Sequence, residues 1–233
     1  MANIDKKNID KKLLLEQLQE TYPKKFKFFK NEFILNNKNV FSPVQFPEGE
    51  WYVKNIPAKS GDSMLEIGCG SGAVSITACK EYNLSEVLCA DINPDAVKNT
   101  NDNIKLTNLS KKMKAIKSNV FSDIDPNKKF DLIFWNIPFE HEKAPGPELI
   151  HRAFFDENFE CVENYVNGAL EKLTDKGRAF IGFSSEIGDI NKLEEVFVKN
   201  NLKMKIHNQE IYKAGDESDL KLEMIEILPN KEK

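Results

Sequence analysis

The sequence contains no apolar run close to the roughly 20 residues that a membrane-spanning helix needs. Its first residues, MANIDKKNIDKK, also lack the apolar core of a secretory signal peptide. Both absences predict a cytoplasmic protein that does not enter a membrane. With 40% hydrophobic and 30% charged residues, the composition is typical of a folded globular chain.

Cysteine is scarce, and no two cysteines form a CxxC pair. The four are Cys69, Cys79, Cys89 and Cys161. Three of them fall in stretches whose pattern is that of a buried strand or helix. This spacing excludes the usual zinc motifs and disulfide frameworks, so we expect reduced thiols in the core and no metal site.

The chain also lacks an overall excess of positive charge. Its formal net charge is −4 and its pI about 5.6, so we expect no strong binding to duplex DNA. Residues 1–38 are the exception, with nine lysines against five acidic residues and aromatic residues between them. This segment either binds RNA or forms an amphipathic cap in which leucines pack inward and lysines face the solvent. The leucines are Leu13, Leu14, Leu15 and Leu18.

The 233 residues fit one large domain with a short appendage. From Ser63 onward, short apolar runs alternate with helical segments, which predicts a parallel sheet with right-handed crossovers. The expected strands are Met64–Ile67, Val87–Ala90, Lys114–Lys117, Leu132–Trp135 and Ala179–Phe183, followed by an antiparallel hairpin of Lys203–Ile211 and Leu220–Leu228. The expected helices are Asp10–Tyr22, Ala73–Tyr82, Asp95–Leu106, Glu160–Leu173 and Asp189–Asn200, with a helix or turn at Glu50–Asn55. A loop rich in Asn, Pro and Phe is expected between the first helix and Glu50.

A glycine-rich turn, EIGCGSG, follows the first expected strand and opens a helix. Gly68, Gly70 and Gly72 would let the backbone approach a cofactor closely. The turn also matches the dinucleotide pattern G-x-G-x-x-[GA], so an NAD(P)-dependent oxidoreductase is an alternative. Glu66 argues against it, because a carboxylate repels pyrophosphate but attracts the ammonium and sulfonium groups of S-adenosylmethionine (SAM).

Asp91 stands at the end of the second expected strand, where an acid can accept hydrogen bonds from both ribose hydroxyls of a nucleoside. A structural alternative is that Asp91 caps the following helix. Asn93 suits that role better, because Pro94 then takes the first helical position. Ile92 would form a wall of the adenine slot. Asn119, after the third strand, either contacts the adenine edge or is an ordinary turn residue.

The segment FDLIFWNIPF delivers Asn136 to the carboxyl edge of the sheet, where ligands of open α/β folds bind. Here the chain resembles the methyltransferases that carry a [DNS]-P-P-[YFW] signature. The likeness extends through EIGCGSG, ADINPDAV and FDLIFWNIPF, so it covers about residues 63–139 well and the terminal hairpin loosely. Within that superfamily the chain looks most like the small-domain group, which includes release-factor glutamine, ribosomal RNA guanine-N2 and adenine-N6 methyltransferases.

The resemblance implies a Rossmann-like, seven-stranded methyltransferase sheet with an antiparallel last strand and a short N-terminal helical cap. It divides the chain into a cap and pocket-entrance segment, residues 1–50, and a SAM-binding domain, residues 51–233. The cofactor-binding residues are then Glu66, Gly68, Cys69, Gly70, Gly72, Asp91, Ile92, Asn119, Val120 and Asn136. The implied activity is transfer of a methyl group from SAM to a nitrogen of a protein glutamine, an RNA base or a small amine.

The resemblance also assigns the catalytic residues Asn136, Pro138 and Phe139. The Asn136 amide oxygen and a carbonyl beside Ile137 would accept hydrogen bonds from the target NH2, and Phe139 would cover one face of the planar group. Such acceptors hold a delocalised nitrogen lone pair in line with the methyl carbon. Ile137 departs from the family pattern, because proline is usual there, and this makes the choice between amine and amide less certain.

Two flanking segments complete the expected site. The long loop that begins at Glu140 and His141 either determines which substrate binds or is an ordinary solvent-exposed loop. No spacing of residues in it is diagnostic of a metal site. Upstream, Phe41–Glu50 either lines the pocket entrance or is a structural linker. A non-catalytic partner subunit with the same fold is a further alternative to the enzyme.

Overall fold

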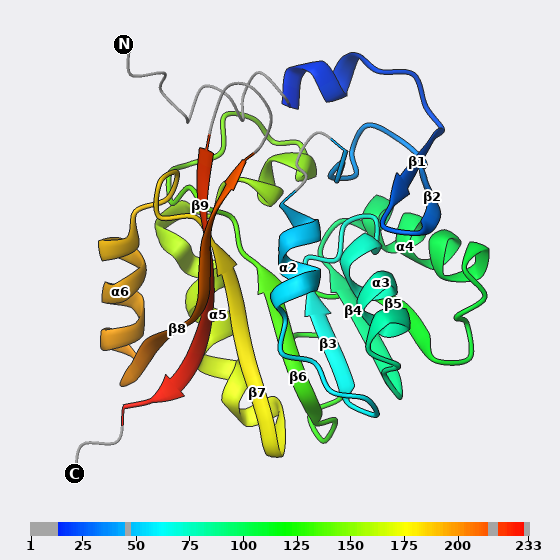
Figure 1. Cartoon of the computed structure of the whole chain (residues 1–233). Helices are drawn as coiled ribbons and strands as arrows, with labels where there is room; N and C mark the ends of the chain where they lie inside the picture. Colours follow the sequence, from blue (N-terminus) through cyan, green and yellow to red (C-terminus); the bar gives the residue numbers. More distant parts are fainter. Residues whose placement is uncertain (1–13, 45–47, 214–218, 231–233) are drawn as a thin grey trace.

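The computed structural model describes residues 14–44, 48–213 and 219–230, and a seven-stranded sheet forms its centre (Figure 1). The strand order is β5-β4-β3-β6-β7-β9-β8; β3 to β7 are parallel, and β9 is antiparallel to both of its neighbours. The strands are β3 (Ser63–Ile67), β4 (Glu86–Asp91), β5 (Met113–Lys117), β6 (Phe130–Asn136), β7 (Leu173–Phe183), β8 (Leu202–Lys213) and β9 (Asp219–Pro229). The predicted Rossmann-like sheet with an antiparallel last strand is confirmed.

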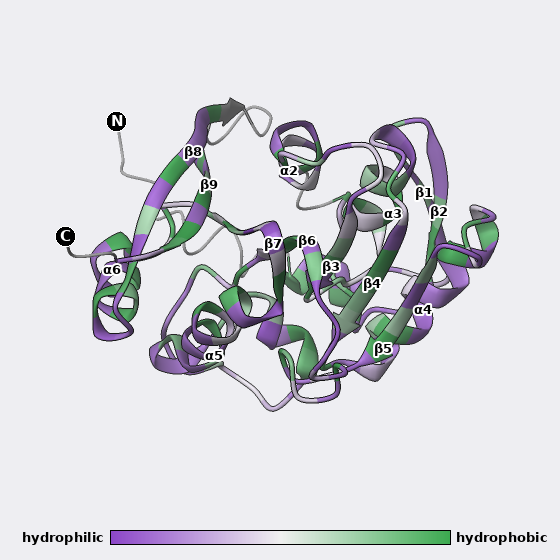
Figure 2. Ribbon diagram, turned by 90° about the horizontal axis from the view of Figure 1, so that it is seen from below, coloured by the Kyte–Doolittle hydropathy of each residue, from purple (hydrophilic) through white to green (hydrophobic). Residues whose placement is uncertain are grey.

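Helices cover both faces of this sheet, which Figure 2 shows from below. α2 (Gly49–Asn55), α3 (Ala73–Glu81) and α4 (Pro94–Leu106) pack on one face, here called the α3 face, and α5 (Glu160–Ala169) and α6 (Ile190–Lys199) pack on the other, the α5 face. Because side chains alternate along a strand, Met64 and Phe134 enter the core of the α3 face, whereas Leu65 and Trp135 enter that of the α5 face. In the described part of the chain, no helix is long and apolar enough to cross a membrane.

An antiparallel hairpin of β1 (Lys24–Phe28) and β2 (Asn31–Leu35) lies where the sequence analysis expected a loop, so that expectation was wrong. It follows a short helix at residues 14–19, called the cap helix below. The pattern in β1 is alternation with period two: Phe26 and Phe28 are buried, and the lysines beside them face outward. Together with Phe33, these rings join the core of the α3 face.

The cap helix packs inward through only part of the expected leucine set. Leu14 is buried and Leu18 contacts the same cluster, which includes Phe154, but Leu15 is 59% exposed. Leu13 lies outside the described residues. The expected amphipathic packing therefore applies to Leu14 and Leu18 and not to Leu15.

β7 begins at Leu173, well before the expected start at Ala179. The helix expected to reach Leu173 ends instead at Ala169 and continues as a single 3-10 turn, η3 (Leu170–Lys172). The early part of β7 is polar and partly exposed, so it gives no hydrophobic signal in the sequence. Its pairing with β6 through Phe130 and Leu173 shows that long-range contacts fix this strand end.

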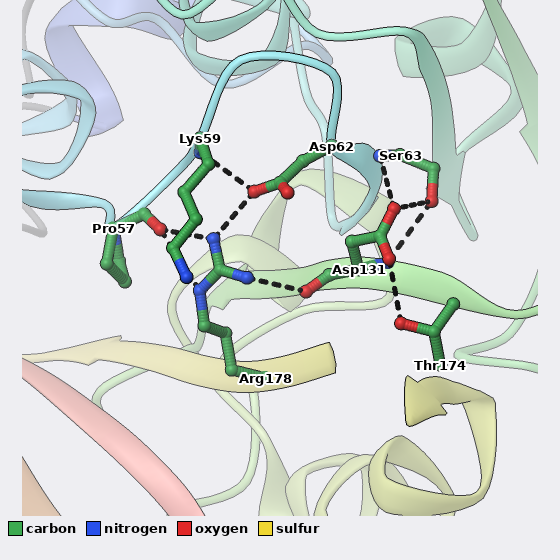
Figure 3. A network of polar contacts seen from close by, with 7 residues as sticks. All are labelled: Pro57, Lys59, Asp62, Ser63, Asp131, Thr174 and Arg178. Carbon is green, nitrogen blue, oxygen red and sulfur yellow. Dashed lines mark hydrogen bonds and ion pairs between the residues drawn. The ribbon is translucent and has the colours of Figure 1, made fainter. Parts of the chain in front are cut away.

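A polar network joins the amino ends of β3, β6 and β7 (Figure 3). Arg178 donates to the Asp62 carboxylate at 2.6 Å and to the backbone carbonyl of Asp131 at 3.2 Å. The Asp131 carboxylate accepts bonds from the backbone and hydroxyl of Ser63 and from the hydroxyl of Thr174. These hydrogen bonds, with that from the Ser63 backbone first, lower the pKa of Asp131. This amino-edge network lies at the opposite end of the strands from the site described next.

Candidate active site

Three polar side chains from three neighbouring strands lie on the same face at the carboxyl edge of the sheet. Glu66 is in β3, Asp91 ends β4 and Asn136 ends β6. Glu66 stands two residues after Met64, and Asn136 two after Phe134, so alternation directs both toward the α3 face. Glu66 is in register with the β4 and β6 residues that stand two positions before Asp91 and Asn136. Three of the predicted site residues are therefore gathered at one place.

The glycine-rich turn between β3 and α3 has a left-handed backbone at Gly68, Gly70 and Gly72, with φ of +64°, +55° and +77°. A Cβ at Gly68 would lie 2.5 Å from the Trp135 indole nitrogen, and one at Gly72 would lie 2.8 Å from an α4 side chain. At Gly70 the nearest atom would be the Cβ of Phe41, at 3.6 Å, an ordinary contact. Packing within the protein therefore requires Gly68 and Gly72, and Gly70 is the glycine with room beside it.

Glu66 lies beneath this turn and is almost fully buried. Its carboxyl accepts a short hydrogen bond from the hydroxyl of Ser75 in α3. Burial raises the pKa of Glu66 to about 8, although the Ser75 bonds act in the opposite direction. A carboxyl in this environment is largely protonated at neutral pH and ionises readily once a cation lies beside it.

Asp91 uses both carboxylate oxygens to order the neighbouring backbone. Oδ2 accepts a hydrogen bond from Gly70 N at 2.9 Å, and Oδ1 accepts one from Asn93 N at 2.9 Å. Burial raises the pKa of Asp91, and these backbone bonds oppose the rise. Asn93 caps α4 with Pro94 at the first helical position, as predicted. Asp91 is therefore free of the capping role and joins the glycine turn to the end of β4.

The remaining predicted cofactor residues differ in their exposure. Ile92 is half-buried and Asn119 is exposed on the turn after β5. Val120 is buried with φ of +52°. The Cys69 thiol points into the core, where its sulfur lies 3.4 Å from the Thr100 hydroxyl. Ile92 and Asn119 can thus face a ligand, whereas the side chain of Cys69 cannot.

The Asn136 amide oxygen is buried and has no hydrogen-bond partner among the described residues. Next to it, Gly182 of β7 is so tightly enclosed that a Cβ there would lie 2.9 Å from this oxygen and 2.6 Å from the Tyr52 ring. Tyr52 is fully buried and donates a hydrogen bond to the backbone carbonyl of Phe183. Leaving a buried acceptor unpaired costs about 1–3 kcal/mol, so a donor from a ligand is the natural partner of Asn136.

The residues after Asn136 form a packed turn. Ile137 is 2% exposed, and its N–H donates to the Gly182 carbonyl at 3.2 Å, a bond that the usual proline is unable to make. Pro138 is buried, and Phe139 is half-buried with its ring edge-on to Phe183 at 5.7 Å. Ile137 therefore fixes this turn to β7 by a hydrogen bond.

The long loop after Phe139 folds back through η1 (Leu149–Ala153) and η2 (Glu157–Phe159). Glu140 is 3% exposed and forms a parallel bridge with Phe155. The His141 ring lies 5.5 Å from that of Phe159. Across the described ranges, no three His, Cys, Asp or Glu side chains are grouped so that they could hold a metal ion.

Two α4 side chains that the sequence analysis did not single out hold the glycine turn. Thr100 donates from its hydroxyl to Gly70 O at 2.9 Å, and Asn103 donates from its amide to Ser71 O at 2.9 Å. Both side chains are fully buried. The sequence could have indicated both residues, because they lie on the inward face of an amphipathic helix, where polar residues are unusual.

The predicted entrance segment is described in part, because residues 45–47 lie outside the described ranges. The Phe41 Cβ lies beside Gly70, 3.6 Å from the position that a Cβ there would take, and the Phe41 ring lies 5.6 Å from that of Phe154 in the loop after η1. Phe41 thus lies between the glycine turn and the loop that follows Asn136.

Known proteins resemble this chain in sequence and in fold. The release factor glutamine methyltransferase of Clostridium botulinum is 28% identical over 82% of this chain and 74% of its own length. The ribosomal protein uL3 glutamine methyltransferase of Francisella tularensis is 30% identical over 49% of this chain and 39% of its own. Two other release factor glutamine methyltransferases are matched over 47% and 34% of their lengths, so the chain spans half or less of several relatives.

Solved structures show the same architecture. The ribosomal protein L11 methylase of Lactobacillus delbrueckii superposes with a TM-score of 0.55, at 18% identity and 80% coverage of both chains. The protein SMU.776, complexed with S-adenosylhomocysteine (SAH), superposes with a TM-score of 0.59, at 15% identity, covering 89% of this chain and 57% of its own. The family model of the methyltransferase small domain matches residues 31–213. The chain therefore belongs to the methyltransferase small domain family and is a methyltransferase with SAM as its methyl donor.

Proposed function

We propose that this chain methylates the side-chain amide nitrogen of a glutamine in a protein, and that Asn136 is the residue that positions this amide. The observation that carries the proposal is the buried Asn136 oxygen without a partner among the described residues. A primary amide offers two N–H donors, and one of them would satisfy this oxygen. Two relatives named as glutamine methyltransferases of a release factor and of a ribosomal protein support a protein acceptor.

The roles of the other residues follow from their places. When bound, SAM would supply a methyl group on a positively charged sulfur: the N–C bond forms as the C–S bond breaks, SAH leaves, and the nitrogen releases one proton to solvent. Glu66 would lie near the cofactor's ammonium group, and Asp91, with its backbone bonds to the glycine turn, would accept the ribose hydroxyls. The Asn136 oxygen would accept from the amide N–H, which orients the nitrogen and disperses the positive charge that it gains.

Pro138 and Phe139 would shape the acceptor side. Pro138 limits the backbone after Asn136 to a narrow range of φ. Phe139, supported edge-on by Phe183, would lie against the planar amide. Ile92, Asn119 and Val120 are proposed to border the adenine.

The test separates cofactor binding from methyl transfer in Asn136→Ala. Calorimetry with SAH should give affinity within a few-fold of the parent, because the proposed anchors of the cofactor lie on β3 and β4. Transfer should fall by about 100-fold, since one preorganised hydrogen-bond acceptor contributes on the order of 3 kcal/mol to a transition state. The assay is labelling of a lysate with methyl-labelled SAM, followed by separation of protein from RNA.

Acid hydrolysis identifies the bond, because a methylated amide releases its label as methylamine whereas methylated lysine or arginine keeps it. Label that enters RNA, or protein label that survives hydrolysis, would overturn the glutamine assignment. Equal transfer by parent and variant would overturn the role of Asn136. Asn101 is not a suitable control, because it is half-buried and its amide donates to the Ala115 carbonyl of β5. Asn119→Ala serves instead as the comparison on the cofactor side.

A further inference from the structure

Gln17 of the cap helix is fully buried, and the polar atoms of its side-chain amide all bind one short segment of irregular structure. Its Nε2 donates to Lys38 O at 2.9 Å and to Val40 O at 2.8 Å. Its Oε1 accepts a bond from Ser42 N at 3.2 Å. One side chain therefore bonds three alternate residues of the segment 38–42, which begins in a turn that Val40 N closes on Asn37 O.

The side chain held between these bonds is Phe41, and it borders the glycine turn. Its Cβ is the nearest atom to the position that a Cβ of Gly70 would take, and its ring contacts that of Phe154. From the other side, the Asn93 amide donates to Asn39 O at 2.7 Å. Segment 38–42 is thus fixed from two directions, by the cap helix and by the start of α4.

From these contacts we propose that Gln17 is a positioning residue that holds Phe41 as a wall of the SAM site. Gln17 itself contacts neither the glycine turn nor Asp91 in any bond described above, so its effect on the cofactor must pass through Phe41. The proposal rests on the assignment of the glycine turn to SAM under the proposed function. A weaker hold on segment 38–42 lowers the fraction of molecules with Phe41 in place, and the apparent affinity falls by the same fraction.

The first experiment measures SAH binding by calorimetry at a temperature well below unfolding. Gln17→Glu keeps an acceptor for Ser42 N but removes both donors to the carbonyls of Lys38 and Val40. If the positioned fraction falls to about one tenth, SAH binds about 10-fold more weakly. Gln17→Met, which has a similar length and no charge, should show a comparable loss and covers the case in which a buried carboxyl prevents folding. Gln19→Ala, at an exposed glutamine of the same helix, should bind SAH within twofold of the parent.

A double-mutant cycle with Phe41→Ala tests whether the effect passes through Phe41. Phe41→Ala alone should weaken SAH binding, and adding Gln17→Met should weaken it little further. A purely structural Gln17 would lower the melting temperature and leave the Kd of SAH unchanged, which would overturn the proposal. A full additional loss in the Phe41→Ala background would overturn it as well. If the parent does not bind SAH, the assignment of the glycine turn fails with it, whereas the other outcomes leave that assignment intact.

Discussion

Glu66 combines two properties that rarely occur together in a side chain without a functional reason: it is an acid, and it is almost fully buried, with Ser75 as its described hydrogen-bond donor. Its pKa of about 8, against an ordinary value of 4.5, means that the folded state keeps a proton that the unfolded state releases. A raised pKa contributes stability that is present below pH 4.5 and is lost as the pH rises to 8. A cation bound beside Glu66 would lower this pKa and stabilise the ionised carboxylate.

Glu66→Gln should remove this pH dependence. Near pH 5 the parent and the variant should be similarly stable, because both carry a neutral side chain. At pH 8.5 the variant should be the more stable protein, by at least about 1 kcal/mol or roughly 2–4 °C in Tm, because each pH unit between the two pKa values corresponds to about 1.4 kcal/mol. Thermal melts at both pH values make the comparison, with Glu81→Gln, at an exposed glutamate of α3, as control. A stability difference that is the same at both pH values would contradict the assignment.

Residues at strand ends could be predicted from the sequence, whereas residues that act across the fold could not. Glu66, Asp91 and Asn136 each follow a recognisable apolar strand, and parallel strands bring their carboxyl ends together. Gln17 gave no such signal, because its three partners lie more than twenty residues away and are all backbone groups. The sequence also did not show why positions 68 and 72 must be glycine, since Trp135 and Thr100 come close to them only in the folded chain.

At the scale of elements, α4 replaces a strand as the partner of β2. The Asn103 amide accepts from Ile34 N at 2.8 Å and donates to Ile34 O at 2.9 Å, and Asn99 donates to Ile34 O at 2.8 Å. Asn99 also accepts from Asn36 N at 2.6 Å. Both asparagines are fully buried, one helical turn apart, so the inward face of α4 satisfies the edge of a hairpin.

Asn103→Ala should therefore destabilise the protein by about 2–4 kcal/mol, because it leaves the N–H of Ile34 and the carbonyl of Ser71 without their bonds. Urea unfolding measures the loss. Lys105→Ala, exposed on the same helix, should change stability by less than about 0.5 kcal/mol. A loss for Asn103→Ala no larger than that of the control would show that water satisfies these backbone groups equally well.

The elements that the sequence predicted well are those with long periodic signals. The strands from β3 to β6 and the final hairpin appeared at the expected places, because their apolar residues are continuous or alternate over several positions. The β1–β2 hairpin was missed because its strands are only five residues long and β1 is rich in lysine, so its alternating phenylalanines were read as part of a basic segment. The start of β7 was missed because bonds to β6, and not its own side chains, define it.

For the whole molecule, the two ends of the strands have different tasks. The carboxyl edge carries an amide oxygen that no described residue pairs and a buried acid with a raised pKa, both of which cost stability. The amino edge carries the network around Asp131 and Arg178 (Figure 3). In this network the hydrogen bonds to the Asp131 carboxylate lower its pKa. The length of the strands lies between the two edges. We therefore expect a loss of stability at the amino edge to leave ligand binding at the carboxyl edge unchanged.

Asp131→Asn should lower stability without altering the cofactor site. The variant keeps the size of the side chain but loses the charge that strengthens the bonds from Ser63 and Thr174, and we expect a cost of about 1–2 kcal/mol at pH 7. The affinity for SAH, measured well below Tm, should stay within twofold of the parent. The exposed Asp175→Asn, next to Thr174, is the matched control and should change neither quantity.

The lowered pKa of Asp131 determines how the stability difference between the parent and Asp131→Asn changes with pH. A lowered pKa contributes stability that is present above the ordinary value of 3.8 and is lost as the pH falls through the folded pKa. The stability difference between parent and Asp131→Asn should therefore be constant from pH 7 to pH 5 and shrink below 3.8, where the parent carboxyl also becomes neutral. Urea unfolding at these pH values follows it. A difference that persists unchanged in acid would mean that the charge of Asp131 contributes nothing, and a weakened SAH affinity at pH 7 would mean that the two edges are coupled through the strands.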